Sequence, residues 1–294
     1  LDVAPGKKEE LLIPFNTINT KAGGEYWLNL SFQHRNPVSW AGRGFEQAWE
    51  QLKVPFRVSK KKNVSVTQLP ELKTEEKGND IIMSGKKFKT VFDKTKGIFT
   101  SYHYNNTALF ENSPRPNFWR APTDNDLGGG ENSYAFRWEA EGLDSLDFKI
   151  DSIQINDADS QSKTIIAVAG SANTTNGTIH FLKAFTVYGN GDIHVASEII
   201  VKGKIPPLAK IGDIFTLDDQ FENMKWYGRG PEESYWDKKQ GHKIGLWSGT
   251  VSEQFVPYVK PQENGNKTDV RWAYLSNPDG LGILVYGLPL LNIS

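Results

Sequence analysis

The amino-acid sequence predicts an all-β protein, and three observations support that prediction. Apolar and polar residues alternate with a period of two in several segments, as they do in strands with one buried face. β-Branched and aromatic residues are concentrated in these segments, which Gly, Pro and Asn-Gly separate. Convincing helical periodicity is rare. An antiparallel β-protein therefore fits the sequence better than a fold with a helical core.

The first unit is predicted to cover residues 1–57 and contains one clear strand. The apolar positions of that strand share one face: Tyr26, Leu28, Leu30 and Phe32. Residues 45–52 are the segment of this unit in which we expect a turn or two of helix. Pro55 closes the unit, and the polar and charged residues 58–78 are predicted to be a surface linker.

The second unit is predicted to cover residues 79–294 and carries the strongest strand signals. Four of its segments are typical of strands: residues 88–92, 98–104, 178–188 and 193–199. Residues 94–97 are predicted to be the turn between the first two. Asn190-Gly191 lies between the last two and predicts a hairpin with a type I′ turn, which needs positive φ at both residues.

The composition excludes several classes of function. The net charge is −1, from 34 basic and 35 acidic residues, and no basic stripe or acidic tail is present. We therefore expect no nucleic-acid partner and no membrane partner, and no apolar run approaches the ~20 residues that span a bilayer. The absence of Cys excludes disulfides and a Cys nucleophile, and it is compatible with a bacterial cytoplasm or periplasm.

Three dense motifs follow one another along the chain. The first comprises LDVAPG at residues 1–6 and the Trp-containing residues 39–49. The second, at residues 117–128, is NFWRAPTDNDLG. The third comprises WYGRGPEESYWDK at residues 226–238 and YVKPQENG at residues 258–265. In this order, the motifs resemble the last part of the β-galactosidases of glycoside hydrolase family 2.

The resemblance implies a fold and a domain order. Residues 1–57 are expected to be the later part of an immunoglobulin-like β-sandwich, and residues 79–294 most of an antiparallel supersandwich of the galactose-mutarotase type. In the family, two catalytic glutamates lie on a (β/α)8 barrel that precedes both domains, and nothing in this chain reads as eight βα units. We therefore expect part of a longer protein, truncated at both ends and inactive alone.

The resemblance also implies the chemistry and partners of the intact protein. The intact protein would hydrolyse terminal β-D-galactosides with retention, and this part would shape the rim of the active site and support assembly. The implied partners are a β-galactoside carbohydrate, the other domains of the same chain and further copies in a homo-oligomer. Mg²⁺ and Na⁺ are expected on the other domains, and this chain is expected to hold no cofactor and no metal.

Asp124, Asn125 and Asp126 fall in a Pro- and Gly-rich loop of the second motif. Two carboxylates at this spacing can bind Ca²⁺ or Mg²⁺, which prefer oxygen ligands. The spacing of an EF-hand is absent, however, and Asp and Asn cap turns by bonding backbone N–H groups. We therefore predict capping, with Arg120 paired to Asp124 or Asp126.

The glycines that follow predict a loop with little steric restriction. By the resemblance, this loop swings near the galactose site of the intact enzyme and has a gating role; an ordinary flexible loop is the alternative. No helix is signalled after it. The candidate rim residues are Gly128, Gly129, Gly130, Glu131, Asn132 and Ser133.

The third motif is expected to hold loops in place. Glu232 and Glu233 point apart in an extended loop, so we reject them as an acid/base pair and expect Glu233 to anchor the loop to Arg229 or Lys238. Residues 234–236 are Ser-Tyr-Trp where the family has Asn-Tyr-Pro, and Lys238 replaces a usual Arg. No catalytic residue is predicted. The motif positions with a predicted structural role are Arg120, Asp124, Asn125, Asp126, Gly228, Gly230, Pro231, Glu233, Tyr235, Asp237, Glu263, Asn264 and Gly265.

Three other functions stay open on the sequence alone. The aromatic residues 226–272, punctuated by Gly and Pro, could form a carbohydrate-binding module without chemistry. The supersandwich could belong to an aldose epimerase, which needs a His and a carboxylate aimed at a sugar. A purely structural assembly module is the third. The histidine candidates for an epimerase are His103, His180, His194 and His242.

Overall fold

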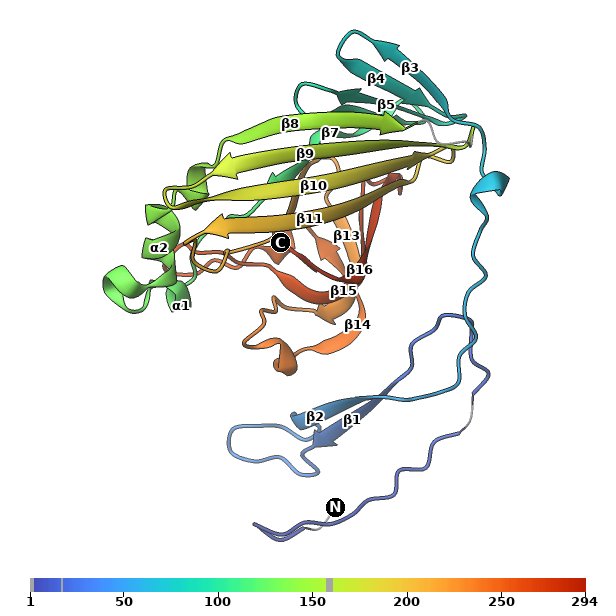
Figure 1. Ribbon diagram of the computed structural model, residues 1–294. Helices are drawn as coiled ribbons and strands as arrows, with labels where there is room; N and C mark the ends of the chain where they lie inside the picture. The colour runs from blue at the N-terminus through green and yellow to red at the C-terminus, as the bar shows by residue number, and fades with distance from the viewer. Residues whose placement is uncertain (1–2, 17, 157–160) are drawn as a thin grey trace. The chain divides into compact units, whose positions relative to one another are not determined.

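The protein is built from antiparallel β-sheets with few helical turns (Figure 1). The computed structural model describes residues 3–16, 18–156 and 161–294. The chain divides into two compact units, Leu1–Asn63 and Val64–Ser294. Strands dominate the second unit and are the regular secondary structure of the described part of the first, so the all-β prediction is confirmed. None of the described helices has the length and apolar character needed to cross a membrane.

The first unit contains the hairpin of β1 (Trp27–Gln33) and β2 (Glu46–Lys53). The predicted strand at residues 26–33 is therefore confirmed, and the helical turns expected at residues 45–52 are wrong. Leu28 lies opposite Leu52 and Phe32 opposite Ala48 in the antiparallel register. Pairing with β1 overrides the weak local helical pattern, as tertiary context commonly does.

A six-stranded sheet opens the second unit, in the order β12-β7-β6-β5-β4-β3. Its strands are β3 (Lys73–Lys77), β4 (Asp80–Ser84), β5 (Phe88–Asp93), β6 (Ile98–Tyr104), β7 (Thr107–Asn117) and β12 (Gly212–Thr216). The predicted turn between β5 and β6 is confirmed, with Gly97 at a φ of +67°. β3 falls within residues 58–78, which were predicted to be a linker. Its charged residues are compatible with an exposed edge strand, so the same polar composition fits either structure.

The second sheet is a four-stranded meander in the order β11-β10-β9-β8. Its strands are β8 (Phe148–Asn156), β9 (Lys163–Asn173), β10 (Gly177–Tyr188) and β11 (Ile193–Gly203). The hairpin predicted at Asn190-Gly191 is confirmed by the β10–β11 pairing. The type I′ turn is not, since Gly191 has a φ of +98° while Asn190 is not among the residues with positive φ.

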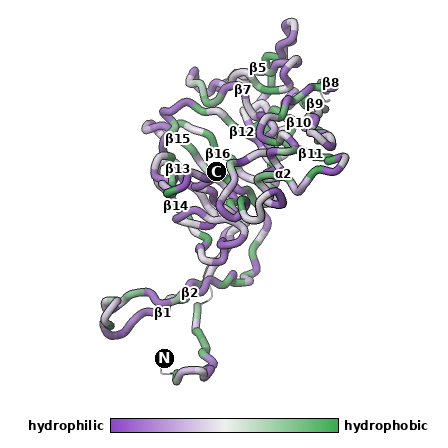
Figure 2. Tube along the Cα trace, turned by 90° about the vertical axis from the view of Figure 1, so that its left-hand side faces the viewer, coloured by the Kyte–Doolittle hydropathy of each residue, from purple (hydrophilic) through white to green (hydrophobic). Residues whose placement is uncertain are grey.

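The main hydrophobic core lies between these two sheets. Hydrophobic and hydrophilic residues alternate along their strands, as the colouring of Figure 2 shows. Phe92 and Phe99 of the six-stranded sheet pack on Phe185 of β10, with ring centroids 5.8 and 5.3 Å away. Each of these rings is fully buried, so apolar burial between the sheets is the main stabilising term of the unit.

The charged side chain of Lys183 enters this core. Lys183 lies on the inner face of β10, and its ammonium bonds the Asp213 carboxylate on β12. Burial lowers the pKa of Lys183, and the neighbouring carboxylate opposes that shift. Because a buried charge is costly without a partner, the pair fixes where β10 and β12 meet.

The third sheet has the order β14-β13-β15-β16. Its strands are β13 (Asn223–Gly230), β14 (Lys243–Thr250), β15 (Lys267–Ser276) and β16 (Gly282–Ile293). Met224, Trp226, Val270 and Ala273 form its buried cluster. Two short helices, α1 (Asp124–Leu127) and α2 (Tyr134–Ala140), follow β7. α2 buries Trp138 in a separate small cluster.

Two isoleucines on opposite faces of the meander test this account of the core. Ile166→Ala empties a fully buried position and should lower the free energy of unfolding by about 2–5 kcal/mol. Ile200→Ala is the matched control, because Ile200 is 40% exposed and should cost about 1 kcal/mol or less. Urea denaturation measures both. Equal losses would contradict the assignment of the buried face.

Candidate functional site

Three loops that are distant in sequence meet on one surface of the second unit. They are residues 118–128 after β7, residues 231–242 between β13 and β14, and residues 255–266 between β14 and β15; we call them the joined loops. The Asp124 N–H donates to Gln262 Oε1 at 3.0 Å, across 138 residues of sequence. Asn125 Nδ2 donates to Asp237 Oδ2 at 3.2 Å, across 112 residues. The second and third motifs therefore form one surface.

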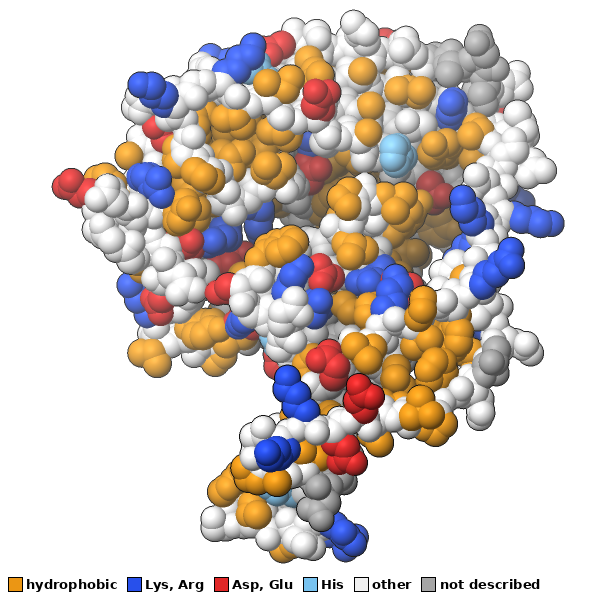
Figure 3. All heavy atoms as spheres, turned by 60° about the horizontal axis from the view of Figure 1, so that its bottom comes forward, with side chains coloured by type: hydrophobic (Ala, Val, Ile, Leu, Met, Phe, Trp, Pro, Cys, Tyr) orange, Lys and Arg blue, Asp and Glu red, His pale blue; other side chains and the backbone are white. Residues whose placement is uncertain are grey.

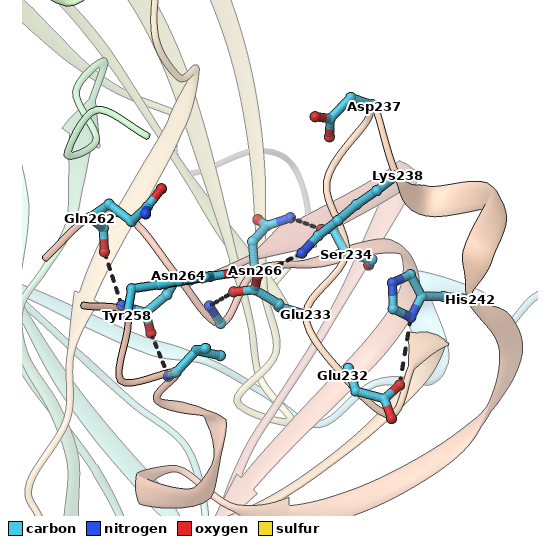
Figure 4. A network of polar contacts seen from close by, with 12 residues as sticks. Glu232, Glu233, Ser234, Asp237, Lys238, His242, Tyr258, Gln262, Asn264 and Asn266 are labelled. Atoms are coloured by element: carbon cyan, nitrogen blue, oxygen red, sulfur yellow. Dashed lines mark hydrogen bonds and ion pairs between the residues drawn. The ribbon is translucent and has the colours of Figure 1, made fainter. Parts of the chain in front are cut away.

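The carboxylate of Glu233 is the anchor of this surface (Figure 4). Its Oε1 accepts from Lys238 Nζ at 2.6 Å and from the Tyr258 hydroxyl, and its Oε2 accepts from the Gly265 N–H at 2.9 Å. The Glu233 side chain is 6% exposed. Of the two partners predicted for Glu233, the structure selects Lys238.

These contacts decide the charge of Glu233. Burial alone would raise the pKa of its carboxyl, but the hydrogen bonds from Lys238, Tyr258 and Gly265 together hold that pKa below its ordinary value. Glu233 is therefore ionised at neutral pH. It has no proton to give and its oxygens are occupied by neighbours, so it acts as an anchor rather than as an acid or base.

Ser234 fixes the same loop to the start of β15. Its N–H donates to the Asn266 carbonyl at 2.7 Å, and its own carbonyl accepts from Asn266 Nδ2 at 2.6 Å. Its hydroxyl accepts from the Thr268 N–H at 2.9 Å. Ser234 is fully buried, so this end of the loop is rigid.

Arg229 has a different partner from the one that the sequence predicted. Its Nε donates to Asp269 Oδ2 at 2.6 Å, and its NH1 donates to the carbonyls of Lys239 and His242 at 2.7 and 2.8 Å. Arg229 therefore holds the far end of the loop that Glu233 and Ser234 hold at its near end.

The glycines of this motif permit close packing. A Cβ on Gly228 would lie 2.9 Å from the Val270 backbone, and one on Gly230 would lie 2.8 Å from the Trp247 ring. Gly265 has a φ of +78°, which favours glycine, and this conformation directs its N–H at Glu233. Asn264 holds its own loop as well: its Oδ1 accepts from the Val256 N–H at 3.0 Å.

The remaining motif positions of these loops vary in burial. Pro231 is exposed, whereas Tyr235 is half-buried. Burial, with Glu233 and Glu263 nearby, raises the pKa of the Tyr235 hydroxyl. Glu263 Oε1 lies 3.4 Å from Lys210 Nζ.

In the second motif, Asp126 confirms the prediction of a capping role. The Thr123 N–H donates to Asp126 Oδ2 at 2.7 Å, which closes a capping box at the start of α1. Arg120 NH1 donates to the same oxygen at 2.6 Å, and its guanidinium lies 5.2 Å from the centre of the Trp138 ring. Burial opposes the ionised form, but these bonds lower the pKa of Asp126. Arg120 thus pairs with Asp126 and not with Asp124, which is exposed and bonds Gln262.

The expected absence of a helix after the glycines is wrong. Residues Gly130–Asn132 form a 3₁₀ turn, and Ser133 caps α2 by accepting from the Phe136 N–H at 3.2 Å. Gly129 and Gly130 have φ values of +106° and +60°, which explains the glycines at the entry to this turn. The short helix carries too few residues for a clear periodic pattern. Residues 128–132 are exposed, and their gating role stays a prediction.

The joined loops do not form a catalytic carboxylate pair. Glu232 is 72% exposed and lies 3.7 Å from His242 Nδ1, on the other side of the loop from the buried Glu233 (Figure 4). Desolvation lowers the pKa of His242, although Glu232 opposes that shift. Among the described residues, no three His, Asp or Glu side chains gather as they would around a metal ion. The arrangement is suited to shaping a surface and to binding.

Sequence reasoning missed three anchoring residues. Tyr258 and Gln262 belong to the third motif, but the sequence predicted no contact for either of them. Asp269 lies outside the motifs and was not predicted to pair with Arg229. Their positions close to Asn264-Gly265 were the available signal. Their partners lie in other loops, which the sequence alone does not bring together.

Glu233→Gln tests the anchor, with Glu232→Gln as the matched control on the neighbouring exposed residue. At pH 7 the first variant should lose about 1–3 kcal/mol of unfolding free energy, because it removes the charge from three hydrogen bonds, and the control should lose almost none. The pKa of Glu233 is depressed in the folded state, so its stabilisation is present above 4.5, the ordinary value, and is lost as pH falls further. Urea denaturation across pH should show the unfolding free energies of the wild type and Glu233→Gln converging in acid. A difference between them that stays constant with pH would contradict the anchoring role of Glu233.

Comparison with known proteins identifies two matched regions. Residues 84–294 match the family described as "Beta galactosidase small chain", and residues 1–55 match "Beta-galactosidase, domain 4". These matches agree with the family that the motifs resemble.

Proteins named β-galactosidase align with almost the whole chain. The one from Priestia megaterium is 34% identical over 295 residues, covering 100% of this chain and 28% of the relative. Those from Vibrio cholerae and Halalkalibacterium halodurans are 26% and 28% identical, covering 92% and 97% of this chain and 27% and 28% of the relatives. This chain thus spans only about 28% of the length of the relatives it matches. The chain belongs to the β-galactosidase small-chain family.

Proposed function

We propose that this chain is the C-terminal, non-catalytic part of a β-galactosidase whose intact form hydrolyses terminal β-D-galactosides with retention. The observation that carries the proposal is the convergence of the second and third motifs into the joined loops, around the buried Glu233. The relative named β-galactosidase from Priestia megaterium aligns with all of this chain through 28% of its own length. In this proposal the rest of the protein supplies the catalytic glutamates, together with sites for Mg²⁺ and Na⁺.

The joined loops would shape the rim of the active site. Asp124, Asn125 and Asp237 are exposed on them and can bond sugar hydroxyls, while the buried anchors keep these groups in place. The candidate rim residues begin directly after α1, at the edge of the same surface; residues 128–132 are exposed and Ser133 is buried. A rim of this kind positions substrate without taking part in bond breaking.

A second surface supports contact with the other domains or with further copies of the protein. Leu246, Tyr227, Trp272 and Tyr286 lie opposite one another across the third sheet and so share a face. Leu246 and Tyr286 are 68% and 70% exposed. Figure 3 shows hydrophobic side chains at the surface among charged ones. We propose that the rest of the intact protein covers this row of side chains.

The geometry supports an aldose epimerase less well. This reaction needs a His and a carboxylate that act together on a sugar. Among the described residues, His242 and Glu232 come nearest to such a pair, with Nδ1 and Oε2 3.7 Å apart. Glu232 is exposed rather than enclosed with a sugar.

A chimera tests the proposed function. The matching 28% of the Priestia megaterium enzyme is replaced by this chain, and hydrolysis of a chromogenic β-galactoside is measured. We expect turnover by the chimera, and none by this chain alone or by the relative without the segment. Turnover by this chain alone, surviving rigorous purification, would contradict the proposal. So would a folded chimera that hydrolyses other glycosides but no β-galactoside.

A further inference from the structure

Trp236 is displayed on the surface by a loop that is held at both ends. The residue is 71% exposed and adds little to the core. Ser234 is buried on one side of it, and on the other side the Lys239 carbonyl accepts from Arg229 NH1 at 2.7 Å. A large exposed aromatic on a rigid support loses little conformational entropy when it binds a ligand.

The Lys239 side chain fixes the orientation of the Trp236 ring. Lys239 Nζ lies 3.5 Å from the ring centre, a cation–π contact. The Lys239 side chain is only 15% exposed, and its Nζ lies 3.4 Å from Asp269 Oδ1, whose partner oxygen accepts from Arg229. One face of the indole therefore contacts a fixed cation, while most of the residue stays exposed.

The loop that carries Trp236 also displays polar groups. Asp237 is the next residue, is exposed and accepts from Asn125 Nδ2 through one carboxylate oxygen. Figure 4 shows Asp237 at the tip of the loop, away from Glu233. The second oxygen of Asp237 and the carbonyl of the Asn125 side chain can accept hydrogen bonds from hydroxyl groups. An exposed aromatic ring on a loop that also displays such acceptors has the components of a sugar-binding platform.

We propose that Trp236 is a stacking platform for a β-galactoside, with Lys239 as the residue that positions its ring. In galactopyranose the axial O4 leaves the C–H bonds at C3, C4 and C5 on one side of the ring, and this apolar patch fits an indole face. The ligand class rests on the proposed function. The platform lies on this chain alone, so its test does not depend on the catalytic domain.

The indole N–H signals of the chain provide the test. The protein has nine Trp, and in a ¹H–¹⁵N spectrum the signal that Trp236→Ala removes belongs to Trp236. Methyl β-D-galactopyranoside is titrated into the wild-type chain. We expect this signal and the backbone amides of Asn125 and Asp237 to shift together. Trp40, 63% exposed in the first unit, is the matched control and should not shift; its signal is assigned with Trp40→Ala.

Two variants separate the outcomes. Trp236→Ala should weaken binding roughly fivefold or more, as followed at the amides of Asn125 and Asp237. Lys239→Met should weaken it less while keeping the indole signal. An unmoved Trp236 signal, equal shifts at Trp40, or equal binding of methyl β-D-glucopyranoside would each overturn the platform as assigned. If the platform is overturned but the chimera hydrolyses β-galactosides, the proposed function stands. If Trp236 binds the galactoside but the chimera is inactive, the proposed function is rejected and the platform stands.

Discussion

The surface of the joined loops depends on one ionised, buried side chain. Glu233 accepts from Lys238 of its own loop and from Tyr258 and Gly265 of the next one. A carboxylate removed from water must have its oxygens satisfied, and the groups that satisfy them here come from two loops. Those loops are therefore fixed relative to each other, and Asp124 and Asn125 extend the connection to a third.

The same arrangement separates support from display. The buried groups, Ser234 among them, hold the backbone, and the exposed groups such as Trp236 and Asp237 contribute almost nothing to the core. Residues of the second kind are free to meet a ligand. The second unit can carry such a surface because its stability comes from elsewhere, from apolar burial between the two large sheets.

Much of the fold was predictable from local pattern, and the failures have physical causes. Alternation and turn residues indicated the strands around residues 94–97 and 190–191, because period and turn chemistry are local properties. β2 was mistaken for helical turns because its partner strand decides its state. In the site, the pairing of Glu233 with Lys238 spans five residues and was one of two predicted alternatives. Its bond to Tyr258 joins separate loops, which only the folded sheet brings together.

The most direct test of Glu233 as the common anchor is amide hydrogen exchange, compared between the wild-type chain and Glu233→Gln. The account predicts faster exchange in residues 231–238 and 256–266, most of all at the Gly265 amide that donates to the carboxylate, with β8 to β11 unchanged. Unchanged exchange at Gly265, or a uniform increase through the whole second unit, would contradict it.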